Sequence, residues 1–101
     1  MDQRVLEVAE LTIKENCVSE FLEGVKRSLP LFEAATGFED LRLVRSIEDP
    51  LTFRLMIHWA SLEDHTETFR NSPAFASWRE NVGEFFASPP RVDHSNEVIS
   101  N

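Results

Sequence analysis

The amino-acid sequence predicts an α+β fold in which four antiparallel strands are covered on one face by helices. Apolar and polar residues alternate with the period of a strand in four segments, at 5–13, 38–47, 52–59 and 91–99. Two further segments, 17–36 and 61–88, carry apolar residues at helical spacing. This order is that of the ferredoxin-like split βαβ plan. A chain of 101 residues forms one domain, so we assign residues 1–101 to a single unit.

The first strand and the first helix are separated by a short polar break at Lys14–Asn16. On the strand, one largely apolar face carries Val5, Glu7, Ala9, Leu11 and Ile13. From Cys17 the period changes to that of a helix. Pro30 lies inside this helix, where a missing hydrogen-bond donor predicts a kink or a restart.

The second and third strands, Phe38–Ile47 and Thr52–Trp59, are predicted to form an antiparallel hairpin. Residues 48–51 connect them, and Pro50 suits the second position of a turn. Alternation places Trp59 on the apolar face of its strand and His58 on the opposite face.

The last part of the chain predicts a second helical region and an edge strand. Ser61 is placed to cap a helix, and Ser72 with Pro73 begins a further one, as N-cap and first helical residue. Pro89 and Pro90 end the helical region. The strand predicted at Arg91–Ile99 is the most polar of the four.

Both faces of the predicted sheet carry apolar side chains, although the helices cover only one of them. An uncovered apolar face costs stability through contact with water. A second copy of the same sheet, related by two-fold symmetry, is the economical cover. The pattern therefore predicts a homodimer.

The charge balance argues against polyanionic partners. Ten Lys and Arg against eighteen Asp and Glu give a net charge of −8, which repels nucleic-acid backbones and anionic lipid surfaces. We therefore expect no nucleic-acid or membrane partner. No apolar run reaches the length of a transmembrane helix either. The chain starts without a signal-peptide pattern and has a single cysteine, Cys17, which predicts a cytoplasmic protein without disulfides.

A motif after the third strand carries a resemblance to a known family. Trp59, Ser61, Glu63 and His65 fit W-x-S-x-E-x-H, and F-R-x-S and F-x-x-W follow at residues 69–72 and 75–78. This resembles the antibiotic biosynthesis monooxygenase family, over most of the chain from Val5 to about Val98. The resemblance implies a dimeric α+β barrel with a ligand pocket between the helices and the sheet. It also implies oxygenase chemistry on acidic polyphenolic rings, without metal or flavin.

His65 is the sharpest candidate for catalysis. It shares a helix face with Leu62 and Phe69, and a histidine in an apolar cleft can act as a general base or hold a substrate oxygen. The alternative is a buried structural histidine. Four aromatic residues are predicted to bind a planar ring, or else simply to fill the core: Trp59, Phe69, Phe75 and Trp78.

Four other polar residues have plainer interpretations. We expect His58 and His94 to be solvated or to lie at a subunit interface. Arg70 and Arg79 could neutralise an anionic substrate, although surface ion pairs with nearby glutamates are the usual interpretation. The histidines have no metal-ligand spacing, so we expect no metal and no cofactor.

Two departures from the family restrict its known chemistries. The haem-degrading branch uses an Asn on the first strand, a Trp and a His. This chain has no Asn on its first strand, and it has Phe69 in place of the Trp and Arg79 in place of the His. Haem degradation is therefore not expected. A polyketide-oxidising branch uses a pocket Tyr, and this chain has no Tyr. Two hypotheses stay open: a cofactor-independent monooxygenase acting on a quinol or aromatic polyketide, and a non-catalytic dimeric small-molecule-binding or stress-response protein with the same pocket.

Overall fold

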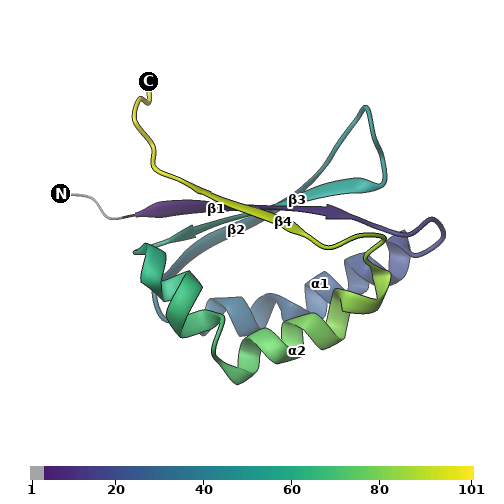
Figure 1. Cartoon of the computed structure of the whole chain (residues 1–101), viewed down its shortest axis with the longest axis horizontal. Helices are drawn as coiled ribbons and strands as arrows, with labels where there is room; N and C mark the ends of the chain where they lie inside the picture. The colour runs from purple at the N-terminus through teal and green to yellow at the C-terminus, as the bar shows by residue number, and fades with distance from the viewer. Residues whose placement is uncertain (1–3) are drawn as a thin grey trace.

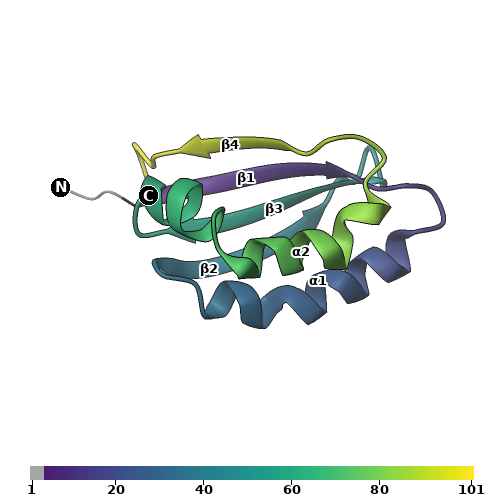
Figure 2. The same ribbon diagram turned by 60° about the horizontal axis from the view of Figure 1, so that its bottom comes forward.

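The computed structural model describes residues 4–101 and has two layers, a four-stranded sheet and the helices that cover one of its faces (Figure 1). The elements follow the order β1 (Val5–Thr12), α1 (Val18–Glu33), β2 (Phe38–Arg45), β3 (Thr52–Trp59), η1 (Asp64–Phe69), α2 (Pro73–Val82), η2 (Gly83–Phe85) and β4 (Arg91–Ser95). The strand order is β2-β3-β1-β4, and each neighbouring pair is antiparallel (Figure 2). The predicted ferredoxin-like fold is confirmed.

The core lies between the sheet and the helices. On the two central strands, alternate residues are buried against the helices, and the register pairs Ala9 with Leu55 and Leu11 with Phe53. Phe21 and Phe32 of α1 pack onto this face with less than 3% exposure. Burying large apolar side chains of this kind contributes about 1.5–3 kcal/mol each.

Helix α1 does not restart at Pro30. The helix continues to Glu33, and the amide of Ala34 still donates to the Pro30 carbonyl at 3.1 Å. Pro30 lies on the exposed side of the helix, where water can satisfy the carbonyl that loses its partner. Of the two outcomes expected at Pro30, a kink or a restart, the restart is therefore wrong.

The region after β3 is less regular than predicted. Ser61 does accept from the amide of Asp64, at 3.2 Å, but the residues that follow form a π-helix over Asp64–Phe69. The second start is as predicted: Ser72 is the N-cap of α2, its hydroxyl accepts from Phe75 N at 3.4 Å, and Pro73 is the first helical residue.

Two predicted strands extend at least two residues beyond the observed ones. β2 ends at Arg45, before the predicted Ile47, and β4 ends at Ser95, before the predicted Ile99. Ile47 and Ile99 are 89% and 88% exposed, so apolar alternation alone did not bring these residues into the sheet.

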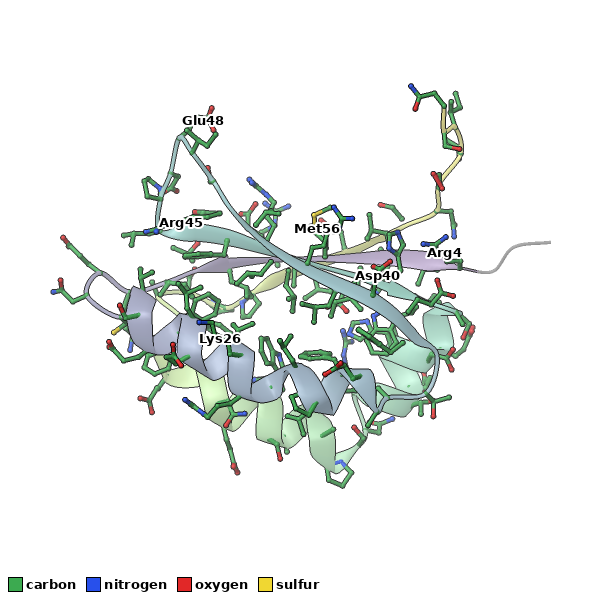
Figure 3. All side chains as sticks on the ribbon, turned by 180° about the vertical axis from the view of Figure 1, so that it is seen from behind. Arg4, Lys26, Asp40, Arg45, Glu48 and Met56 are labelled. Carbon is green, nitrogen blue, oxygen red and sulfur yellow. The ribbon has the colours of Figure 1, made fainter. Side chains whose placement is uncertain are left out.

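The sheet face away from the helices is mixed in character. Leu6, Val8 and Met56 are half-buried there, and Met56 can be seen on the side opposite the helices (Figure 3). Charged pairs lie between them, including Arg54 Nη2 to Glu10 Oε2 at 3.5 Å. Within residues 4–101, no helix is long and apolar enough to cross a membrane.

Candidate functional site

A cavity of about 310 Å³ opens between the sheet and the helices, near strands β1 and β4. Its volume is at the lower end of the range typical of small-molecule sites. Most of its lining is apolar, and its ionisable side chains are Glu7, His65, Arg70 and Arg79. The apolar lining comprises Ala9, Leu11, Phe32, Leu55, Phe69, Phe75, Trp78, Phe86, Pro90 and Val92. Such a cavity suits a flat ligand with few polar groups.

Glu7 forms the polar floor of the cavity. It lies on the central strand β1, on the face that is otherwise apolar, and is 5% exposed. The indole N–H of Trp59 donates to Glu7 Oε1 at 2.9 Å. The contact of Glu7 with His65 is also made by Oε1, and Glu7 is part of the cavity lining. Among residues 4–101, no hydrogen bond to the second oxygen, Oε2, is found.

His65 links Glu7 to a second histidine. Its Nε2 lies 3.4 Å from Glu7 Oε1, and its Nδ1 lies 2.8 Å from Nε2 of His94. The imidazole stacks on the indole of Trp59, with ring centroids 5.4 Å apart and planes 18° from parallel. These contacts fix the orientation of His65, and the chain of polar groups runs from the cavity floor toward the half-buried His94.

Burial shifts the pKa of both groups at the floor. Loss of solvation raises the pKa of Glu7 from 4.5 to about 7, against the opposing effects of the Trp59 hydrogen bond and the Arg70 charge. Burial also lowers the pKa of His65 from 6.5 to about 4, and positive charge on His94 and Arg70 adds to this. The pKa of His94 is lowered too, by burial and then by Arg70. Near neutral pH, His65 is neutral and Glu7 can take up or release a proton.

The π-helix explains how two cavity residues come together. The amide of Arg70 donates to the carbonyl of His65 at 3.0 Å, five residues back. This wider turn lets both His65 and Arg70 contribute to the lining. Single π turns of this kind are frequent at functional sites.

Three of the four predicted ring-binding residues line the cavity, and the fourth lies behind it. Phe69, Phe75 and Trp78 belong to the lining, with Phe69 and Phe75 in an edge-on contact at 5.9 Å between centroids. Trp59 is fully buried and is not part of the lining. Its position beneath His65 and its hydrogen bond to Glu7 give it a supporting place in the site.

Arg70 and Arg79 do not form the surface ion pairs that were the usual interpretation. Among residues 4–101, neither guanidinium has a carboxylate within 4.0 Å, and both line the cavity. The guanidinium of Arg79 lies over the ring of Phe75, at 5.9 Å from its centroid.

Sequence reasoning missed Glu7 and misplaced His94. The signal for Glu7 was present, since it is the one charged residue on the apolar face of its strand. His94 was expected to be solvated or at an interface, but β4 pairs with β1 so that His94 lies opposite Glu7. His58 is half-buried on the other face, where its Nδ1 contacts Asp40 Oδ1 at 2.7 Å.

The donor set does not resemble a metal centre. Among the residues that the structure describes, no three His, Cys, Asp or Glu side chains are grouped so as to hold a metal ion. Both nitrogens of His65 face other side chains of the network, whereas a metal ligand needs one nitrogen directed at the ion.

Comparison with known proteins identifies the family. The family model for antibiotic biosynthesis monooxygenase matches residues 4–81, most of the chain. The chain belongs to the antibiotic biosynthesis monooxygenase family. The matched part of this family member includes Glu7, His65 and both cavity arginines, and it ends before β4 and His94.

Individual relatives agree with this family membership. The Bacillus subtilis protein YczJ is 32% identical over 94 residues, covering 93% of this chain and 99% of its own length. A crystal structure from Bordetella bronchiseptica, of a protein assigned to the antibiotic biosynthesis monooxygenases, superposes with a TM-score of 0.94 at 36% identity and covers 96% and 99% of the two chains. SnoaB from Streptomyces nogalater, a cofactor-independent oxygenase, shares the fold, with a TM-score of 0.82 at 14% identity and coverage of 97% and 96%.

Proposed function

We propose that this family member is a cofactor-independent monooxygenase that oxidises a quinol or an aromatic polyketide-like ring. The observation that carries the proposal is the buried Glu7–His65 pair at the floor of an aromatic-walled cavity. A general base acts best when its pKa lies near the working pH, and burial brings the pKa of Glu7 to about 7. Family membership and the oxygenase named among its structural neighbours support the same reaction class.

The reaction that we propose is balanced without a metal or flavin. Glu7 takes the proton of an acidic ring hydroxyl or of the carbon acid of an anthrone, and the ionised ring is electron-rich enough to reduce O₂. One oxygen atom forms a new bond to a ring carbon, the O–O bond breaks, and the other oxygen atom leaves as water. The ring loses two hydrogens and four electrons, and O₂ gains the same four electrons.

Each side chain of the site has a role in this scheme. Glu7 accepts the proton through Oε2, while neutral His65, whose two nitrogens contact Glu7 and His94, orients Glu7. His94, half-buried beyond His65, passes the proton toward solvent. Phe69, Phe75 and Trp78 hold the ring, since stacked and edge-on aromatic contacts add about 0.5–1.5 kcal/mol each.

Oxygen uptake with a panel of hydroquinones and anthrones tests this proposal. We expect wild-type protein to consume O₂ above the protein-free rate, and His65→Ala to lower that rate by about 100-fold, a typical contribution of a positioned acid–base group. His58→Ala is the matched control, because His58 contacts Asp40 and does not line the cavity, and the sedimentation mass of this variant should equal that of wild type. Binding of the same compounds without oxygen uptake would contradict the oxygenase and support the alternative, a non-catalytic small-molecule-binding protein.

We further propose that the protein works as a homodimer that buries the mixed face of the sheet. Leu6, Val8 and Met56 on that face are only half-buried in one subunit, and a second sheet would cover them. Sedimentation equilibrium should return the mass of two chains. A single-chain mass at micromolar concentration would contradict this assembly.

A further inference from the structure

We infer that the ligand of the cavity is an aromatic acid, whose ring hydroxyl faces Glu7 and His65 and whose carboxylate is bound by Arg70 and Arg79. This deepens the proposed function by naming a substrate class. It rests on that function only in placing the hydroxyl at the Glu7–His65 end.

The first observation is the placement of the two arginines. Among residues 4–101, they are the only cationic side chains in the lining, and apolar residues make up the rest of it apart from Glu7 and His65. Arginine presents a planar fork of donors that matches a carboxylate, and its charge is not lost at any physiological pH. A neutral aromatic hydrocarbon would offer no acceptor to the guanidinium of either arginine.

The second observation is that both guanidiniums lack a carboxylate of their own. Other cations of the described residues, such as Arg42 and Arg91, also lack an ion pair, but they are exposed and do not line the cavity, whereas Arg70 and Arg79 do. Elsewhere Arg4 pairs with Glu39 at 2.8 Å and Arg54 with Glu10 at 3.5 Å. At the cavity, a carboxylate of the ligand can take the place that a protein carboxylate has at those sites.

The electric field inside the cavity favours the same ligand. The charge of Arg70 reaches Glu7, His65 and His94, so it lies close enough to stabilise negative charge at the polar end of the cavity. Asp93 opposes Arg70 at His94, but Glu7 is the one acidic side chain of the described lining, and salt screens exposed charges farther away over about 8–10 Å. A local anion site can therefore exist on an acidic protein.

The walls define the rest of the ligand. Phe75 and Trp78 of α2 and Phe69 before it supply aromatic surface, and the volume of about 310 Å³ suits one ring system of two or three fused rings rather than a long chain. Arg79 lies over Phe75, so its guanidinium is held beside the ring-binding surface.

Calorimetric titration with two probes that are not quinols tests the inference without turnover. 6-Hydroxy-2-naphthoate and 2-naphthol share a ring and a hydroxyl and differ by the carboxylate. We expect the naphthoate to bind at least about tenfold more tightly, which corresponds to roughly 1.4 kcal/mol. The preference should fall in Arg70→Gln and in Arg79→Gln, and should vanish in the double variant.

Arg27→Gln is the matched control, since it removes the same charge from an exposed position on α1 away from the cavity. The control should keep the wild-type preference. Equal affinity for the two probes, no binding of either, or a preference that survives in the double variant would overturn the inference. Oxygen uptake with neutral quinols but no preference for the carboxylate would contradict this inference and support the proposed function. A preference for the carboxylate without oxygen uptake would support this inference and contradict the proposed function.

Discussion

Glu7→Gln should lower kcat for quinol or anthrone oxidation by at least about 100-fold while leaving the fold intact. Glutamine has the shape of glutamate, and its amide oxygen can still accept from Trp59 Nε1, the bond that is 2.9 Å long with Glu7. It cannot accept a proton from the substrate. In wild-type protein, kcat/KM should rise with pH through the pKa of about 7, and this rise should be absent in the variant.

Glu23→Gln is the control for this experiment. Glu23 lies on the exposed side of α1, where it pairs with Lys26 at 3.6 Å, and its removal should leave kcat within about twofold because surface ion pairs contribute little. A Glu7→Gln enzyme with near-normal kcat would show that Glu7 is not the base.

The pH dependence of folding stability should change sign between two variants. The folded protein holds a proton on Glu7 between pH 4.5 and about 7 that the unfolded chain has released, so this group makes stability fall as pH rises through that range. His65 does the reverse: between about 4 and 6.5 the unfolded chain binds a proton that the folded protein does not, so stability rises. Each contribution is about 3 kcal/mol, and in wild-type protein the two largely cancel.

Single substitutions should separate the two contributions. In His65→Gln the contribution of Glu7 remains, opposed only by that of the half-buried His94, and the free energy of unfolding should fall between pH 4.5 and 7. In Glu7→Gln the contributions of His65 and His94 remain and have the same sign, so the free energy of unfolding should rise between pH 4 and 6.5. Urea denaturation across this range measures both slopes. Parallel slopes in the two variants would mean that burial does not shift these groups in opposite directions.

Much of the fold was predictable because the local residue pattern of most elements agrees with the strand pairing and helix packing of the folded protein. The alternation at Thr52–Trp59 predicted β3 to the residue, and Ser72 with Pro73 predicted the start of α2. The predictions failed where local pattern competed with tertiary context. Apolar alternation continued to Ile47 and Ile99 without a neighbouring strand to pair with.

The site was less predictable, because it depends on register and not on local sequence. His65 and three of the aromatic residues could be placed from helical spacing alone. His94 reaches the site only because β4 pairs with β1 in the register that sets it opposite Glu7. Glu7 could have been found from its own strand, since a charge on an apolar face requires a buried partner. The π turn that brings Arg70 to the cavity has no simple sequence signal.

The origin of the oxygen atom in the product tests the central claim most directly. Chelator-treated, flavin-free protein should convert anthrone to anthraquinone under ¹⁸O₂ with one labelled oxygen at the oxidised ring carbon, at a rate that depends on Glu7 and His65. Unlabelled anthraquinone, or labelled product formed no faster than without the protein, would contradict the assignment of this cavity to a cofactor-independent oxygenase.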